Sequence, residues 1–99
     1  MARLVYSRQA ASDIDEITAF SVTQFGVEVA GDYLTGLELA CELLREFPEM
    51  AAIYPRARPE MRCLIYRSHR IFYRVDEEQV LVVRVLDHAR DVGSAMKGV

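Results

Sequence analysis

Apolar residues recur at helical spacing along two neighbouring stretches in the first half of the chain. The first stretch begins after Ser7, a residue type that caps helix N-termini, and ends before Gly26, a residue type that often follows helix C-termini. Its apolar positions are Ala10, Ala11, Ile14, Ile17, Phe20 or Ser21, and Phe25. The second stretch ends before Pro48, because a proline disfavours the helical conformation of the residue before it. Its apolar positions are Ala30, Tyr33, Leu34, Leu37, Cys41 and Leu44.

The pattern of the whole chain predicts a two-layer α+β domain. Gly26 leaves room for only a short turn, so the two helices must pack as an antiparallel hairpin. Alternation with a period of two then predicts four strands, at residues 2–7, 61–67, 70–75 and 79–86. The predicted order is β-α-α-β-β-β, with the helical hairpin packed on one face of a mostly antiparallel sheet.

The sequence also predicts the position of the last strand in the sheet and the nature of the segments between and after the strands. Residues 80–83 are apolar on both faces, which predicts a central place in the sheet for the last strand. Residues 48–60 hold all three prolines and predict an ordered connector. Ser68 and His69 carry a weak turn signal between two strands. Residues 91–99 show no periodicity and predict a flexible tail.

The length of 99 residues suits one domain, so we expect residues 1–99 to form a single unit. No apolar run approaches the ~20 residues that span a bilayer, and the N-terminus lacks the apolar segment of a signal peptide. We therefore expect a cytoplasmic protein. Cys41 and Cys63 form no CxxC motif, and His69 and His88 do not fall at ligand spacing from them. This predicts free thiols, no metal and no cofactor.

Charge is divided unevenly along the chain. Residues 1–50 hold three basic against nine acidic side chains, a net charge of −6, whereas residues 51–99 hold nine against six, a net of +3. Eleven of the twelve basic residues are arginines, whose planar guanidinium suits carboxylates and phosphates. Arginines on neighbouring strands predict a cationic surface for an acidic partner or a nucleic acid. Its residues are Arg62, Arg70, Arg84 and Arg90, with His88 beside them.

An alternative for these arginines is pairing within the protein. Acidic residues that are near them in the sequence would supply the partners. These are Glu60, Asp76, Asp87 and Asp91. The acidic side of the second helix is most simply a solvated surface, because charged residues normally occupy the face of a helix that points away from the core.

An ordered set of motifs carries a resemblance to a known family. The motifs are Tyr6-Ser7-Arg8-Gln9-Ala10, Asp13-Ile14-Asp15-Glu16-Ile17, Phe25-Gly26, Ala30-Gly31-Asp32-Tyr33, Pro48, Met61-Arg62, the run His69 to Val75 and the run Val83 to Asp91. Over roughly residues 3–91 this order resembles the ParE branch of the RelE/ParE toxin superfamily. The family usually has leucine directly before histidine near its end, whereas here Asp87 separates Leu86 from His88.

The resemblance implies a bacterial type II toxin that inhibits DNA gyrase by direct binding, without enzymatic activity. It also implies neutralisation in a hetero-oligomer by a ParD-like antitoxin of the ribbon-helix-helix class, with no direct DNA binding by this chain alone. The cationic surface would then contact the target. The residues expected to contact the antitoxin are Tyr33, Leu34, Tyr54, Arg67 and Arg74.

Relatives on the RelE side instead cleave mRNA on the ribosome, and this is the alternative function. Such a nuclease needs a general base and a general acid beside cations that hold the phosphate. Arginine stays protonated and is a poor base, no lysine lies in the predicted sheet, and no tyrosine follows Tyr73. Only His69 and His88 titrate near neutrality. We therefore expect no catalytic residue. A nuclease that uses the cationic surface with His88, and a degenerate member that only binds its partner, stay open.

Overall fold

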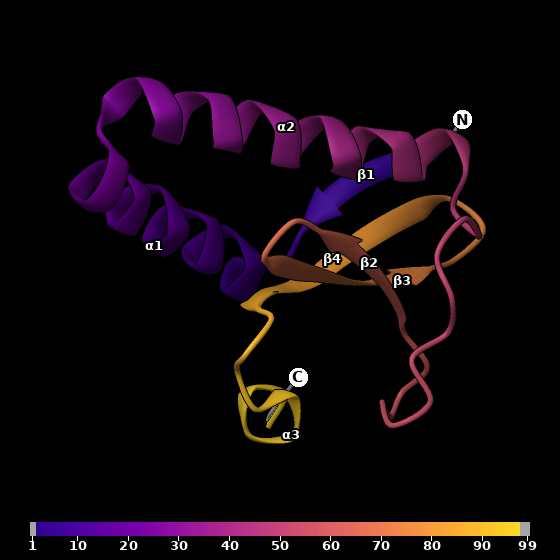
Figure 1. Ribbon diagram of the computed structural model, residues 1–99. Helices are drawn as coiled ribbons and strands as arrows, with labels where there is room; N and C mark the ends of the chain where they lie inside the picture. The colour runs from indigo at the N-terminus through magenta and orange to yellow at the C-terminus, as the bar shows by residue number, and fades with distance from the viewer. Residues whose placement is uncertain (1, 98–99) are drawn as a thin grey trace.

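The helical hairpin and the sheet form two layers in the computed structural model, which describes residues 2–97 (Figure 1). In chain order the elements are β1 (Arg3–Tyr6), α1 (Arg8–Phe25), α2 (Val27–Glu46), β2 (Arg62–Tyr66), β3 (His69–Val75), β4 (Gln79–Asp87) and α3 (Val92–Ala95). Within the described residues the strands form one sheet in the order β1-β4-β3-β2. β1 runs parallel to β4, and the other pairs are antiparallel. The predicted class and order are confirmed, and β4 lies inside the sheet as expected.

Local sequence signals set the ends of the two long helices. Ser7 Oγ accepts a hydrogen bond from the backbone N–H of Ala10 at 2.9 Å, which caps α1. Gly26 alone separates α1 from α2 and adopts a φ of 88°, a value that residues with a side chain rarely adopt. Because one residue reverses the chain, α1 and α2 lie on the same face of the sheet (Figure 1).

Each face of the sheet carries its own apolar core. On the face of the hairpin, Leu37 and Leu44 of α2 are buried in one cluster with Ile71 of β3. On the opposite face, Phe72 of β3 and Leu86 of β4 are buried in a second cluster. Successive residues of β3 therefore serve different cores, as the period of two predicts.

The second face is covered by a segment that the sequence analysis expects to be a flexible tail. Residues 92–95 instead form α3, on the opposite side of the sheet from α1 and α2 (Figure 1). Asp91 caps this helix by accepting a hydrogen bond from the N–H of Gly93 at 3.1 Å, and Ala95 is buried in the second core. Tertiary packing orders the segment, which is why periodicity does not reveal it. Residues 98 and 99 of the expected tail lie outside the described residues.

The β2–β3 hairpin turns one residue earlier than the sequence predicts. Arg67 and Ser68 form the turn, with Arg67 at a φ of 51°, and His69 is already the first residue of β3. His69 is paired across the strands with Asp87, the last residue of β4. The imidazole therefore belongs to the sheet and lies beside a carboxylate.

A buried ion pair joins α1 to the sheet. Arg84, of which 8% is exposed, donates from Nε and Nη2 to the two carboxylate oxygens of Asp13, both at 2.8 Å. The backbone N–H of Val85 donates to the same carboxylate at 2.9 Å, and Arg84 Nη1 donates to the carbonyl of Ala95. The hydrogen bond to Asp13 raises the pKa of the Arg84 guanidinium above its ordinary value. One carboxylate thus connects α1, β4 and, through the arginine, α3.

A bulge in β4 places this arginine. Phe72 pairs with Arg84, but the next residue, Tyr73, pairs with Val82, so β4 carries one extra residue. Such a bulge redirects a side chain relative to a regular strand. The prediction that Arg84 belongs to an exposed cationic surface is wrong, because its guanidinium is buried against Asp13. Arg84 pairs with Asp13, which is not among the acidic residues predicted as internal partners of the arginines. Those residues were Glu60, Asp76, Asp87 and Asp91.

Hydrogen bonds of a tyrosine join α2 to the β2–β3 hairpin. Tyr33 Oη lies 2.6 Å from His69 Nδ1 and 3.3 Å from Ser68 Oγ. Burial lowers the pKa of His69 below its ordinary value of 6.5, although the nearby Asp87 opposes this shift. The imidazole is therefore neutral near pH 7. In the tautomer with its proton on Nε2, His69 accepts a hydrogen bond from the Tyr33 hydroxyl at Nδ1.

Replacing Asp13 by alanine leaves the Arg84 guanidinium buried without its carboxylate. Removing one partner of a buried pair costs about 3–5 kcal/mol, so we expect D13A to lose about that much free energy of unfolding in urea titrations. The matched control is Asp15→Ala, on the exposed side of the same helix, which should stay within about 0.5 kcal/mol of the wild type. A loss in D13A no larger than that of the control contradicts the structural role of the pair.

The lowered pKa of His69 makes stability depend on pH. Below pH 6.5 the unfolded chain binds a proton at this position more readily than the folded chain, so the free energy of unfolding falls as the pH falls. We expect His69→Gln to remove this contribution, measured as the difference in urea midpoints at about pH 5 and about pH 7. His88→Gln, at an exposed loop histidine, serves as the control and should keep the wild-type slope. An unchanged slope in H69Q would show that His69 is not its source.

Candidate functional site

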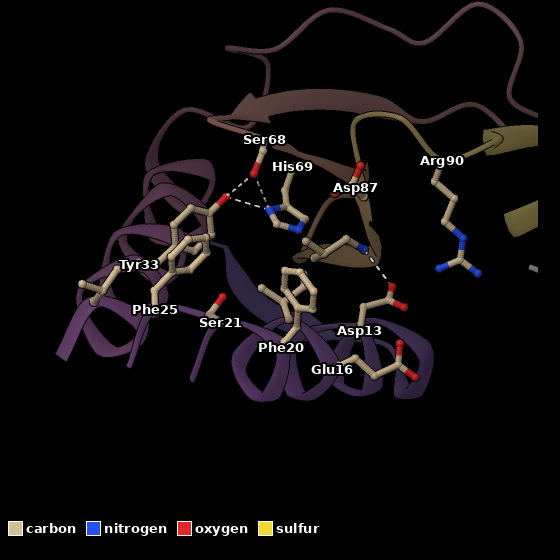
Figure 2. Close-up of a pocket in the computed structure, with 13 residues that line it drawn as sticks. Asp13, Glu16, Phe20, Ser21, Phe25, Tyr33, Ser68, His69, Asp87 and Arg90 are labelled. Atoms are coloured by element: carbon tan, nitrogen blue, oxygen red, sulfur yellow. Dashed lines mark hydrogen bonds between the residues drawn. The ribbon is translucent and has the colours of Figure 1, made fainter. Parts of the chain in front are cut away.

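An open groove of about 500 Å³ separates the helical hairpin from the ends of β3 and β4. Figure 2 shows Phe20 of α1 within it and His69 on the sheet side, with Tyr33 and Phe25 at one end and Arg90 beyond Glu16 at the other. We call this hollow the apolar groove. Its residues are Asp13, Glu16, Ile17, Phe20, Ser21, Phe25, Val29, Tyr33, Ser68, His69, Val85, Asp87 and Arg90.

Large apolar side chains of the groove face solvent. Phe20 is 61% exposed and Phe25 64% exposed, and Val29 of α2 is also exposed. Both phenylalanines belong to the apolar stripe predicted for the first helix, and such a stripe normally faces a core. The structure leaves them without cover, because the far end of the hairpin extends past the sheet (Figure 1). Exposed apolar patches of this kind mark sites of interaction.

The polar floor of the groove is preorganised. Tyr33 Oη is hydrogen-bonded to His69 Nδ1, and the Tyr33 ring packs edge-on against both His69 and Tyr66, at centroid distances of 5.6 and 5.4 Å. The carboxylate of Asp13 is already occupied by Arg84. The groove therefore combines a fixed polar floor with exposed apolar side chains.

A second hollow lies on the other face of the sheet. It measures about 550 Å³ and separates the proline-rich connector from α3. We call it the cationic cleft, because five of its side chains are basic and one is acidic. Its residues are Tyr54, Arg56, Ala57, Arg58, Met61, Arg70, Arg90, Asp91, Val92, Gly93, Met96 and Lys97.

Arg70 is the inner basic residue of the cleft. Its Nη2 donates to the carbonyl oxygens of His88 and Arg90, both at 3.0 Å, and its guanidinium lies 5.8 Å from the ring centre of Phe72. Its Nε is buried and has no hydrogen-bond partner within residues 2–97. A buried donor without a partner is energetically costly.

The predicted target-contact residues do not form one surface. Arg70 and Arg90 meet in the cationic cleft, whereas Arg84 is buried. Arg62 donates to the carbonyl of Ala51 at 2.7 Å, on the side of the connector where a third, smaller hollow lies. His88 is exposed on the loop after β4, and its backbone N–H donates to the carbonyl of Ser68.

The residues predicted to contact an antitoxin are also spread apart. Tyr33 lines the apolar groove and Tyr54 lines the cationic cleft. Leu34 is half-buried on α2 and belongs to neither hollow. Arg67 lies in the β2–β3 turn with its guanidinium 5.7 Å from the Tyr66 ring centre, and Arg74 is exposed near the other end of β3.

The connector residues Arg56 and Arg58 are not among the residues predicted from the sequence to form a site, whereas the segment 91–99, which contains Lys97, is predicted to be an accessory of the arginine surface. The clustering of basic residues in the second half was the available signal. It did not reveal that the connector and the C-terminal segment meet, because that requires the tertiary packing of α3. The cationic cleft is therefore a product of the fold.

The described residues provide neither a cluster of metal ligands nor an activated thiol. Residues 2–97 contain no cluster of three or more metal-ligating side chains. Burial raises the pKa of both thiols, Cys41 and Cys63, so neither is activated as a nucleophile. Of the described residues that line the cationic cleft, none is a histidine, and the single carboxylate, Asp91, caps α3. The basic side chains of the cleft can hold an anion.

None of the helices in residues 2–97 combines the length and apolar character of a membrane span.

Comparisons with known proteins agree on one family. Residues 4–92 match the model of the family described as ParE toxin of type II toxin-antitoxin system, parDE. Toxin ParE1 of Caulobacter vibrioides is 38% identical over 80 residues, which cover 81% of this chain and 82% of the relative. Toxin ParE1 of Mycobacterium tuberculosis is 34% identical over 92 residues, which cover 92% and 94%.

A solved structure described as the chromosomal ParDE TA system from P. aeruginosa has the same fold. It superposes with a TM-score of 0.77 at 25% identity, covering 88% of this chain and 96% of the other. The resemblance seen in the sequence is thereby confirmed. The chain belongs to the ParE toxin family and is the toxin of a ParDE-type toxin–antitoxin system.

Proposed function

We propose that this toxin inhibits DNA gyrase by direct binding, without catalysing a reaction, and that a ParD-like antitoxin neutralises it in a hetero-oligomer. Both events would take place in the cytoplasm, where gyrase acts on the chromosome. The observation that carries the partner assignment is the apolar groove, with two exposed phenylalanines above a preorganised floor. An amphipathic helix recognises such a groove by inserting apolar side chains at helical spacing.

The size and chemistry of the groove support a helical partner segment. Phe20 and Phe25 of α1 and Val29 of α2 line it, so a bound helix would pack between the two arms of the hairpin and the sheet. Large aromatic side chains that become fully covered are the usual sources of binding energy at interfaces. A ribbon-helix-helix antitoxin would supply this segment from outside its own DNA-binding domain.

Binding without catalysis is supported by what surrounds the basic residues. Arg70 and Arg90 supply positive charge in the cationic cleft, but His88 belongs to neither hollow, and Arg84 is committed to Asp13. The alternative function, ribosome-dependent mRNA cleavage, draws its only support from the charge of this cleft. A nuclease would need a proton-transfer group beside the phosphate.

The groove can be tested with substitutions that spare the core. We expect the double variant Phe20→Glu/Phe25→Glu to fold normally and to bind its cognate ParD-like antitoxin about 100-fold more weakly, because two exposed aromatic anchors are lost. The matched control is Leu39→Glu/Phe47→Glu, at positions of equal exposure outside the groove, which should bind normally. Equal loss in both variants, measured by calorimetry, would argue against the groove as the antitoxin site.

The target can be tested with purified toxin in two parallel assays. We expect the toxin to inhibit supercoiling of relaxed plasmid by gyrase and to leave mRNA intact in a translating extract. His88→Gln should inhibit gyrase within a few-fold of the wild type, since the proposed inhibition involves no proton transfer by the imidazole. Cleavage of mRNA that His88→Gln abolishes would instead support the nuclease alternative.

A further inference from the structure

We propose that the outer face of α2, near the C-terminal end of this helix, binds a basic and partly apolar surface of gyrase. The inference rests on the proposed function, inhibition of gyrase by direct binding. It adds which surface of the toxin makes the contact and what chemistry the target must offer there. We call this surface the apolar ridge. Its residues are Leu39 and Leu43 of α2, and Phe47 and Met50 directly after the helix.

The side chains of the ridge are apolar yet face solvent. Leu39 is 62% exposed, Phe47 58% and Met50 50%, and Leu43 is exposed as well. Residues 39, 43 and 47 are spaced four apart, so they lie next to one another along one side of the helix. This side points away from the sheet, because α2 buries its other side in the core below it (Figure 1). An exposed apolar patch of this kind marks a site of interaction.

Hydrogen bonds fix the backbone that presents the end of the ridge. The N–H of Met50 donates to the carbonyl of Phe47 at 3.0 Å. Between these two residues, the carbonyl of Pro48 accepts a hydrogen bond at 2.8 Å from the hydroxyl of Tyr73, a residue of the core. The two apolar side chains are therefore held at the surface by an ordered turn. Anchors that are already in place lose less conformational entropy when a partner binds.

Acidic side chains follow one flank of the ridge at the same spacing of four. We call them the acidic row, and they are Glu38, Glu42 and Glu46. Glu42 and Glu46 share a hollow of about 320 Å³ with the two leucines of the ridge and with Arg45. Within residues 2–97, Arg45 pairs with Glu42, whereas the other two acids of the row make no ion pair. Like charges four residues apart destabilise a helix, and basic side chains of a partner would relieve this repulsion.

This combination of charge and apolar surface favours gyrase over a second copy of the toxin. An enzyme that acts on DNA holds the phosphates with lysine and arginine, so gyrase must have basic surfaces. A second copy would instead bring two acidic rows into one interface, and the chain has a net charge of −3. The ridge therefore suits a surface of the target on which basic residues surround apolar ones.

The ridge is separate from the surface proposed for the antitoxin. Among the described residues, none that lines the hollow beside the ridge also lines the apolar groove or the cationic cleft. A segment bound in the groove leaves the ridge open, so neutralisation would come from the rest of the antitoxin, which blocks the approach of a large target. Binding of gyrase and binding of the antitoxin should therefore be separable by substitution.

The double variant Leu39→Lys/Phe47→Lys tests the ridge. It removes two apolar anchors and places positive charge opposite a basic partner. We expect the toxin concentration that half-inhibits supercoiling by gyrase to rise about 30-fold or more. Affinity for the cognate ParD-like antitoxin, measured by calorimetry, should be unchanged. The matched control is Val27→Lys/Ile65→Lys, at two exposed apolar positions outside the ridge and the groove, which should inhibit within a few-fold of the wild type.

The variant Glu42→Gln/Glu46→Gln tests the acidic row. Binding of the wild-type toxin to immobilised gyrase should weaken between about 0.05 M and about 0.3 M salt, because salt screens exposed charges. The variant should bind several-fold more weakly at the lower salt concentration and respond less to added salt. Glu77→Gln/Glu78→Gln changes the net charge equally at exposed positions in the turn between β3 and β4, and should keep the wild-type response.

The outcomes separate this inference from the proposed function. A wild-type toxin that neither binds nor inhibits gyrase would contradict the proposed function itself. Full inhibition by Leu39→Lys/Phe47→Lys, with an active wild type, would refute the ridge alone. Loss of antitoxin binding in this variant, with melting curves that show a folded protein, would assign the ridge to the antitoxin. Self-association of the wild type in analytical ultracentrifugation, abolished by this variant without a change in inhibition, would make the ridge an interface between copies. An equal response to salt in Glu42→Gln/Glu46→Gln and the wild type would contradict the role of the acidic row.

Discussion

The carboxylate of Asp13 is the point at which the parts of this fold are held together. It accepts hydrogen bonds from two nitrogens of Arg84 and from the backbone of Val85, while the same arginine donates to the carbonyl of Ala95. Removing two charges from water costs several kcal/mol per ion, so such a pair persists only with excellent geometry and satisfied hydrogen bonds. Both conditions are met here. The pair fixes α1 against the sheet, which shapes the groove, and fixes α3 beneath it, which shapes the cleft.

The apolar groove and the cationic cleft lie on opposite faces of the sheet. The hairpin is long enough to extend past the sheet, so its far end has apolar side chains but no strand beneath them. Among residues 2–97, the opposite face is covered by the proline-rich connector and the four-residue helix α3, and arginines of the second half of the chain reach solvent between them. Acidic side chains therefore line the groove on the hairpin face, and basic side chains line the cleft on the opposite face. A partner that binds both faces would meet two different chemistries.

The elements that depend on local signals could be predicted from the sequence. Ser7, Gly26 and Pro48 mark helix ends by backbone chemistry, and alternation marks the strands, so the hairpin and the sheet were predictable. The rest depends on contacts between distant segments. Nothing local shows that Arg84 follows a bulge and is buried by Asp13, 71 residues earlier. Likewise α3 has no periodicity of its own, and the exposure of Phe20 and Phe25 reflects where the sheet ends.

The order of the strands has a consequence for the synthesis of the protein. β4 is the last strand to be made, yet it pairs with β1 on one side and with β3 on the other. A nascent chain that has not yet released residue 79 from the ribosome holds β1 and the β2–β3 hairpin without the strand that joins them. Contacts between distant parts of a chain form late in folding, because they require the closure of long loops. Neither hollow can be complete until almost the entire chain has emerged, so a prematurely terminated toxin would lack both hollows at once.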